Sequence, residues 1–225
     1  MKKIKYKINK IYNLVFGEKF YKKLDFNWDN LPKRYDLINL VIEKKNYETY
    51  LEIGCDQDET FNQIRIKNKI GVDPIEGGNV RKTSDDFFKE NKLKFDCIFI
   101  DGLHTYDQVK KDVYNSISVL NKDGTIFIHD CLPKSYFYQA VPRSRNIWNG
   151  DVWKIIVEFR LKNDFDTSTC FIDQGLGIIK IRPNSNLFEY KIKNFKKLKF
   201  KQFYYNHKDF MNIINYKEIN NFLEI

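Results

Sequence analysis

Hydrophobic and polar positions follow two different rhythms along the chain. Residues 4–16 and 33–46 place apolar side chains three or four positions apart, which predicts two amphipathic helices. From residue 50 onward the apolar positions gather into short runs, at 50–54, 69–74 and 95–101, and each run ends in glycine, proline or an acid. Runs of this length with such ends are typical of buried strands.

Helical segments lie between these runs. Thr83 begins a capping box ahead of one helix, and Thr105 caps a second helix whose apolar side chains recur every three or four residues. Residues 79–83 leave room for only a very short third strand, and residues 124–130 form a fifth strand after a turn at 121–124. Alternating strands and helices predict a parallel sheet with helices on both faces.

This alternation ends after residue 131. Residues 132–154 form an irregular insertion that carries two prolines, two arginines and two tryptophans. Residues 168–173 and 177–182 predict a hairpin, so the last strand of the sheet is antiparallel. The apolar positions between residues 210 and 223 predict a helical tail.

These elements together predict one α/β domain. We expect a Rossmann-like, open and mostly parallel sheet with helices on both faces, an antiparallel last strand, and helical appendages at both ends. The expected parts are a helical N-terminal extension over 1–46, an α/β core over 47–183 that contains the insertion at about 132–154, and a basic C-terminal extension over 184–225.

The composition fits a globular protein, because 42% of the residues are hydrophobic. No run reaches roughly 18 apolar residues, and the lysine-rich N-terminus lacks the apolar segment of a secretory signal. We therefore expect a cytoplasmic protein without a transmembrane segment. Four cysteines without CxxC spacing fit buried thiols in a reducing compartment. The net charge of +9 follows a richness in lysine along the whole chain, so we expect no nucleic-acid partner.

Two strand ends in the middle of the chain carry acids and imidazoles. One strand ends in Asp101, with His104 three residues later, and the next strand ends in His129 and Asp130. One helix separates the two strands, so they are adjacent and parallel and end at the same edge of the sheet. Open α/β sheets bind ligands at that edge. By strand alternation His129 points away from Asp130, which favours a packed or hydrogen-bonded histidine.

The first strands end in groups that suit a nucleoside. The first strand closes with Glu52-x-Gly54, and glycine there lets the chain turn closely beneath a ligand. Asp73 ends the second strand, where a carboxylate is the usual partner of a ribose diol. Asp85 follows the short third strand and is a candidate acceptor for an adenine amino group.

In this order the motifs resemble a class I S-adenosylmethionine-dependent methyltransferase, over about residues 48–182. The resemblance rests on Tyr50-Leu-Glu-Ile-Gly-Cys55, Gly71-Val-Asp-Pro74, Phe95-Asp-Cys-Ile-Phe-Ile-Asp-Gly-Leu-His-Thr-Tyr106 and Gly124-Thr-Ile-Phe-Ile-His-Asp130. These stretches are similar to the subgroup described as methyltransferase domain 24, whose members are thought to modify sugars or small metabolites. The resemblance implies S-adenosylmethionine as cofactor, bound by Glu52, Gly54, Cys55, Asp73, Pro74, Ser84, Asp85 and Asp101.

The loop after the first strand departs from the family pattern. That loop usually reads E-x-G-x-G-x-G, whereas this chain has Asp56 and Asp58 at the second and third glycine positions. Acids there would repel a pyrophosphate, which argues against NAD and suits a cofactor with a cationic sulfonium and no phosphate. The missing glycines leave a catalytically degenerate binding domain open as an alternative.

Asp101 and Asp130 have two alternative roles. They hold a divalent cation such as Mg²⁺, which would clamp acceptor hydroxyls and lower their pKa, or Asp101 contacts the amino group of the cofactor while Asp130 caps its strand. Catechol-type methyltransferases are similar in placing acids at both strand ends, but they usually continue with Asn where this chain has Cys131. His104 is the candidate general base, unless it merely caps the next helix. The predicted catalytic set is His104, Asp101 and Asp130.

The irregular insertion follows the fifth strand and should overhang the same edge. Arg143 and Arg145 are candidates for binding phosphate or carboxylate, and Trp148 is a candidate for stacking on a sugar. The alternative is a packed loop or a subunit contact in a homodimer. We therefore predict an O-methyltransferase that acts on a sugar hydroxyl of a glycan or nucleotide-linked sugar, as in polysaccharide biosynthesis, with a small-metabolite acceptor as the alternative.

Overall fold

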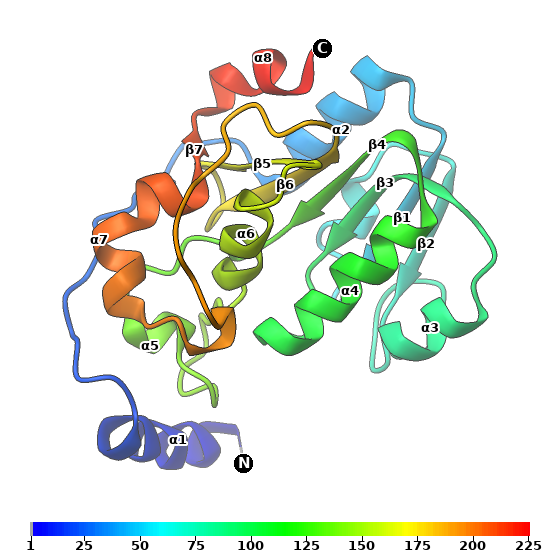
Figure 1. The fold of residues 1–225 in the computed structure, drawn as a ribbon. Coiled ribbons are helices and arrows are strands. Elements are labelled where there is room, and N and C mark those ends of the chain that lie inside the picture. Colours follow the sequence, from blue (N-terminus) through cyan, green and yellow to red (C-terminus); the bar gives the residue numbers. More distant parts are fainter. Residues whose placement is uncertain (1) are drawn as a thin grey trace.

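A computed structural model describes residues 2–225, which form a seven-stranded sheet flanked by helices (Figure 1). The strands lie in the order β2-β1-β3-β4-β6-β5-β7. Their bounds are β1 (Thr49–Ile53), β2 (Asn68–Val72), β3 (Phe95–Ile100), β4 (Leu120–Ile128), β5 (Phe165–Cys170), β6 (Leu176–Ile181) and β7 (Ile213–Ile214). The helices are α1 (Lys2–Phe16), α2 (Arg34–Lys45), α3 (Ser84–Glu90), α4 (Tyr106–Val119), α5 (Tyr136–Gln139), α6 (Trp153–Arg160), α7 (Phe200–Met211) and α8 (Ile219–Leu223).

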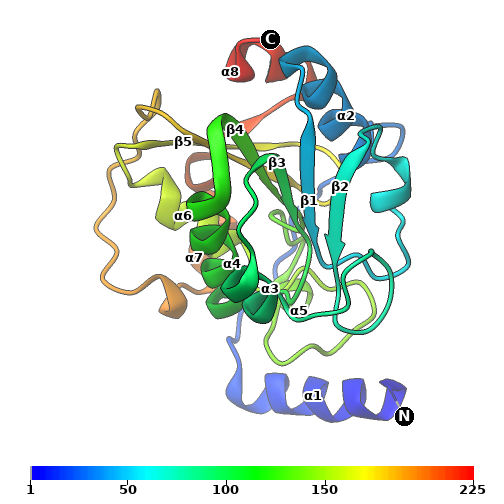
Figure 2. The ribbon, with the colours of Figure 1, turned by 90° about the vertical axis from the view of Figure 1, so that its right-hand side faces the viewer.

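Both faces of the sheet are buried, which explains why the central strands read as continuous apolar runs. In β3, Cys97 and Phe99 belong to the core that contains α2 and α8, whereas Ile98 and Ile100 belong to the core that contains α4, α6 and α7. Side chains alternate between the two sides because successive residues of a strand point to opposite faces. Figures 1 and 2 show these two helical layers with the sheet between them.

The predicted fold class is confirmed. The strands β1 to β4 are parallel to one another, and β6 pairs antiparallel with both β4 and β5. The predicted hairpin is therefore formed by β5 and β6. The carboxyl ends of β1 to β4 meet at one edge of the sheet, so the two acidic strand ends are brought together as their order in the chain predicted.

The short third strand is reduced to one bridge, in which Val80 pairs with Val72. The side chain of Asn79 takes the place of further strand pairing, because it accepts from the amide of Gly71 and donates to the carbonyl of Lys69. Because this side-chain amide replaces the backbone hydrogen bonds of a strand, the segment has no run of alternating residues from which a strand could be predicted.

Residues 121–124 also differ from their prediction as a turn. They lie inside β4, which begins at Leu120 and shifts its register against β3 between Phe95 and Cys97. The register shift accommodates the extra residues, so β4 begins directly after α4 and no separate turn lies between them.

Two further differences concern helices. The tail is not helical throughout, because Asn212 adopts a left-handed conformation that ends α7 and leads into β7. Helix α6 lies at the end of the insertion, where no helix was predicted. All eight of its residues are buried, including Lys154, Glu158 and Arg160, so the helix has no solvent-exposed face.

No helix in the described part of the chain has both the length and the apolar character needed to cross a membrane.

Candidate active site

A cleft of about 1480 Å³ opens at the carboxyl ends of β1 to β4. Its lining includes every predicted site residue except Arg145. The cleft also contains residues that sequence reasoning missed, among them Tyr6, Arg34, Gln108, His129 and Gln174. Residues from four strand ends, from α1 and α2, and from the insertion therefore share one cavity.

Gly54 brings the first loop close to the end of β3. Its φ of +87° is in the left-handed region, and a Cβ atom there would lie 2.5 Å from the carbonyl oxygen of Asp101. Only glycine fits this approach, because any side chain would overlap the backbone of Asp101 and Gly102. The contact fixes the loop against the strand end that carries Asp101.

The loop retains a glycine-like backbone where its glycines are missing. Asp56 and Asp58, which stand at the second and third glycine positions of the family pattern, have φ values of 46° and 61°. Aspartate adopts this left-handed region more readily than most residues. The loop therefore adopts a left-handed backbone at both positions without glycine.

Asp73 ties this loop to the end of β2. One carboxylate oxygen accepts from the amides of Cys55 and Asp56, both at 3.1 Å, and the other accepts from the amides of Ile75 and Glu76 at 2.8 and 3.0 Å. A carboxylate has about four lone-pair sites, and these four amides occupy them, so the predicted contact with a ribose diol would be shared with the backbone. The structure thus gives Asp73 the role of holding the loop.

The other predicted cofactor residues differ in whether their polar groups already have partners within the protein. Burial raises the pKa of Glu52 to about 8, and the Tyr50 hydroxyl donates to its carboxyl group at 2.6 Å. Asp85 pairs with Lys111 at 3.0 Å and accepts from Gln108 at 2.9 Å, and these contacts lower its pKa. Ser84 and Pro74 line the cleft, and burial raises the pKa of the Cys55 thiol.

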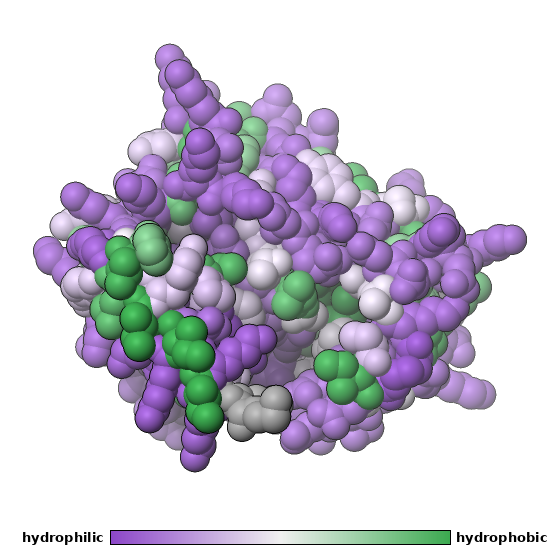
Figure 3. All heavy atoms as spheres, turned by 90° about the horizontal axis from the view of Figure 1, so that it is seen from below, coloured by the Kyte–Doolittle hydropathy of each residue, from purple (hydrophilic) through white to green (hydrophobic). Residues whose placement is uncertain are grey.

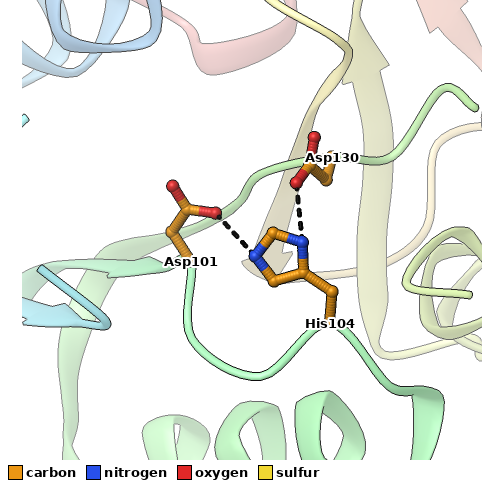
Figure 4. A group of neighbouring side chains, drawn as sticks. All are labelled: Asp101, His104 and Asp130. Carbon is orange, nitrogen blue, oxygen red and sulfur yellow. Dashed lines mark ion pairs between the residues drawn. The ribbon is translucent and has the colours of Figure 1, made fainter. Parts of the chain in front are cut away.

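His104 lies between the two acidic strand ends (Figure 4). Its Nδ1 is 2.8 Å from Oδ2 of Asp130, and its Nε2 is 3.4 Å from Oδ1 of Asp101. The ring stacks on Trp148, with centroids 5.5 Å apart and planes 6° from parallel. The helix after His104 is capped by Asp151, whose carboxylate accepts from the amide of Tyr106, and the Thr105 side chain forms no capping bond. The structure therefore corrects the predicted cap at Thr105.

The surroundings of His104 favour a proton on Nδ1 in its neutral form. Nδ1 faces two acceptors, the carboxylate of Asp130 and the carbonyl oxygen of Trp148 at 2.9 Å, so Nδ1 is the donor. Burial alone would lower the pKa of His104, but the charge of Asp130 and the hydrogen bonds to both carboxylates outweigh it and raise the pKa well above 6.5. These contacts therefore favour the imidazolium form of His104 in the free protein.

His129 is a site residue that strand alternation did not predict. As expected it is buried and hydrogen-bonded, but β4 ends at Ile128, so alternation no longer sets its direction. Its Nδ1 lies 3.2 Å from Oδ1 of Asp101, and its Nε2 contacts the carbonyl oxygen of Asp173 at 2.8 Å. Burial opposes its positive charge, but Asp101 and Asp130 raise its pKa to about 9. Asp101 is thus held by two histidines.

Arg34 and Asp173 complete this charged cluster. Nη1 of Arg34 lies 2.8 Å from Oδ2 of Asp173, and both side chains are nearly buried. The two residues begin α2 and follow β5, far apart in the chain, so no sequence pattern could join them. Burial would raise the pKa of Asp173, but the charges of His129 and Arg34 lower it.

Asp101, His104 and Asp130 can together hold a metal ion, because one ligand atom from each lies within 4.8 Å of the others. The donor set is two carboxylates and one imidazole, rather than the oxygen ligands that Mg²⁺ prefers. Cys131 offers no further ligand, since it is fully buried and its thiol donates to the carbonyl oxygen of Ile128 at 3.3 Å.

The two arginines of the insertion have different surroundings. Arg143 lines the cleft, with its guanidinium 5.5 Å from the ring centroid of Trp148 and 5.4 Å from that of Tyr6. Arg145 lies outside the cleft lining and stacks at 3.5 Å on the ring of Tyr138. The structure therefore brings Arg143 and Trp148 to the cleft but not Arg145. The two arginines lie two positions apart in the same irregular segment, so the sequence does not distinguish them.

Comparison with known proteins finds one family model that matches the central part of the chain. Residues 45–131 match the model of a methyltransferase domain, which covers β1 to β4 and both acidic strand ends. No curated protein matches the sequence. Among solved structures, a putative O-methyltransferase from Klebsiella pneumoniae is 10% identical over 70% of this chain and 84% of its own length, with a TM-score of 0.50. A putative caffeoyl-CoA O-methyltransferase from Staphylococcus aureus is 19% identical over 77% of this chain and 90% of its own length, with a TM-score of 0.49.

Proposed function

We propose that this chain is a class I S-adenosylmethionine-dependent methyltransferase that transfers a methyl group to a hydroxyl oxygen of a small metabolite. The observation that carries the proposal is the Asp130–His104 pair at the centre of the cleft. It places an oriented imidazole beside the strand ends where the family binds its cofactor.

The cleft has features that suit the cofactor. The first loop passes close to Asp101 without a side chain at Gly54, and acids at positions 56, 85 and 101 favour a cationic ligand. Gly54, Asp85 and Asp101 are the residues we assign to cofactor binding, while Asp73 shapes the loop through its four backbone hydrogen bonds. When bound, the cofactor supplies a methyl group on a positively charged sulfonium.

Proton removal is the task of His104. His104 would take the hydroxyl proton of the acceptor on Nε2, while the bound cofactor would supply the methyl group from its sulfonium and leave as the neutral thioether. Asp130 keeps the proton of the neutral ring on Nδ1, which leaves the lone pair of Nε2 on the side of Asp101, whose carboxylate is 3.4 Å away and also lines the cleft. A cation beside Asp101 weakens the hold of Asp101 on the Nε2 proton, so cofactor binding favours the basic form of His104.

The acceptor side supports a small molecule that carries an acidic group. Arg143 lies in the cleft lining with its guanidinium 5.5 Å from the ring centroid of Trp148, and a guanidinium suits carboxylate or phosphate. The similar structures named above are called O-methyltransferases, and neither name refers to a sugar or glycan. We therefore adopt the small-metabolite alternative in place of the glycan acceptor.

Calorimetry with S-adenosylhomocysteine and a methylation screen test this function. We expect saturable binding of S-adenosylhomocysteine, and no binding at millimolar ligand would leave only a degenerate domain. Among hydroxylated small molecules, those with a carboxylate or phosphate should be preferred over their neutral amides or alcohols. Arg143→Gln should remove that preference, while Arg145→Gln, whose side chain stacks outside the cleft, should keep it. Equal effects of the two substitutions would refute the role of Arg143.

A metal-assisted form of the same reaction is a second candidate, favoured by the three ligand atoms of Asp101, His104 and Asp130. These residues fit an ion that accepts nitrogen, such as Mn²⁺ or Zn²⁺, better than Mg²⁺. Such an ion would supply Lewis-acid activation of the acceptor hydroxyl.

Chelation of metal ions distinguishes the reaction with His104 as the base from the metal-assisted reaction. We expect the methylation rate to be unchanged by EDTA, because His104 and His129 already pair with the carboxylates of Asp101 and Asp130. A loss of activity in EDTA that Mn²⁺ or Zn²⁺ restores would instead assign the site to a metal and exclude His104 as the base. Inductively coupled plasma mass spectrometry of the purified protein provides an independent check.

A further inference from the structure

Helix α1 exposes its apolar face to solvent. Ile4, Ile8, Ile11 and Val15 are 58–65% exposed. Their spacing of four, three and four residues places them in one line along the helix. We call this line the α1 stripe. The adjacent Phe16 is 73% exposed, which extends the stripe at the end of the helix.

The opposite face of α1 is polar and fastened to the protein. Asn13 is 1% exposed and donates to the carbonyl oxygen of Pro142 at 2.9 Å, and Asn9 donates to that of Arg143 at 2.7 Å. Tyr6, on the same side, contacts the guanidinium of Arg143. Amphipathic helices of globular domains ordinarily turn their apolar side inward, so the orientation of α1 is inverted.

The charges of α1 are all of one sign. Helical spacing places Lys3, Lys7 and Lys10 along one border of the α1 stripe and Lys5 along the other, and the helix contains no acidic residue. Lysines on the borders of an apolar face can rest their methylene chains on it while their ammonium groups reach outward. This arrangement matches an apolar layer covered by negative charge.

We propose that α1 docks the protein on the surface of an anionic lipid bilayer. The α1 stripe enters the boundary between head groups and acyl chains, and the flanking lysines contact the anionic head groups. A second copy of the chain fits less well, because two such helices would oppose lysines with no carboxylate of α1 to pair with them.

The same side of the molecule carries the cleft. Figure 2 shows α1 beyond the ends toward which β1 and β2 point, and Tyr6 of α1 lines the cleft. Figure 3, seen from this side, shows hydrophobic side chains exposed among hydrophilic ones beside a hollow. Docking through α1 would therefore turn the cleft toward the membrane surface. The docking proposal does not depend on the proposed function.

Vesicle sedimentation with the full chain tests the proposal. We expect binding to vesicles of phosphatidylcholine and phosphatidylglycerol that is at least about tenfold stronger than binding to phosphatidylcholine alone, and that weakens with salt. Ile8→Asp should reduce the binding at least about tenfold, because it places a charge in the stripe. Leu93→Asp is the matched control, since Leu93 is 57% exposed in the loop between α3 and β3, and it should leave binding unchanged.

A second variant separates charge from burial. The triple substitution Lys3→Gln, Lys7→Gln and Lys10→Gln keeps the stripe and should abolish the preference for phosphatidylglycerol. Equal sedimentation of the wild type and Ile8→Asp would overturn the proposal, as would absence of binding at low salt. Light scattering provides the remaining outcome, because a dimer that Ile8→Asp dissociates would assign the stripe to a second copy of the chain.

Discussion

Replacing His104 by alanine should lower kcat for methyl transfer by about 10²–10⁴-fold, the usual contribution of a general base. The affinity for S-adenosylhomocysteine should change little, because His104 contacts the acidic strand ends and Trp148 rather than the first loop. Steady-state assays of methyl transfer measure kcat, and calorimetry measures the affinity for S-adenosylhomocysteine. An alanine variant with the wild-type rate would remove His104 from the mechanism.

Asp130→Asn provides a variant in which the shape of the site is retained. The amide of Asn149 donates to Oδ1 of Asp130, so an asparagine would keep its oxygen there and turn its NH₂ group toward Nδ1 of His104. Nδ1 would then have to accept, and the proton of the neutral ring would move to Nε2. We expect a loss of kcat similar to that of His104→Ala, without a loss of cofactor affinity. A mild effect would show that orientation of the ring is not needed.

The pH dependence of the wild type follows from the same pair. The pKa of His104 is raised well above 6.5, and only the neutral ring can accept a proton. The rate should therefore rise with pH through the raised pKa and stay low at pH 6.5, where the imidazolium dominates. A rate that is already maximal at pH 6.5 would contradict this assignment.

Asp73→Ala is expected to have the second large effect, on cofactor binding and on stability together. It would leave four backbone amides without their acceptor at a residue that is 8% exposed. Each unpaired buried donor costs about 1–3 kcal/mol where water cannot replace the carboxylate. We expect the unfolding free energy to fall by about 3 kcal/mol or more and the affinity for S-adenosylhomocysteine to fall at least about 100-fold.

Asparagine cannot rescue this position, because its NH₂ group would face two of the backbone N–H donors. Glu76→Gln is the matched control: it changes an exposed carboxylate on the same loop whose side chain does not hold the first loop. Chemical denaturation and calorimetry below the unfolding temperature measure both effects. If Asp73→Asn kept wild-type affinity and stability, the loop would be held by other contacts.

The sequence predicted the parts of the site that depend on local order in the chain. Asp101 and Asp130 could be placed side by side because one helix joins their strands, and a short connection of this kind makes neighbouring parallel strands. The approach of His104 to both acids was not predictable, since it depends on the path of the loop over Gly150. A Cβ atom at Gly150 would lie 1.7 Å from the carbonyl oxygen of His104, so the loop requires glycine there.

Contacts between distant segments account for the differences. Arg34 and His129 meet near Asp173 only because α2, β4 and the turn after β5 converge at one end of the sheet. The helical period of residues 4–16 predicted α1 correctly, but a period gives no information about which face turns toward the protein. The orientation of α1 is fixed by Asn9 and Asn13, whose side-chain amides donate hydrogen bonds to two backbone carbonyl groups of the insertion.

The left-handed backbone at Asp56 and Asp58 has a consequence for how relatives of this chain are recognised. A search for the letters E-x-G-x-G-x-G treats both positions as losses, although both residues have the left-handed backbone that glycine adopts freely. Asn and Asp share this tolerance, so a pattern written in permitted backbone angles would accept them beside glycine. Sequences classed as inactive because they lack these glycines could then be divided into those with Asn or Asp at the same positions and those with other residues.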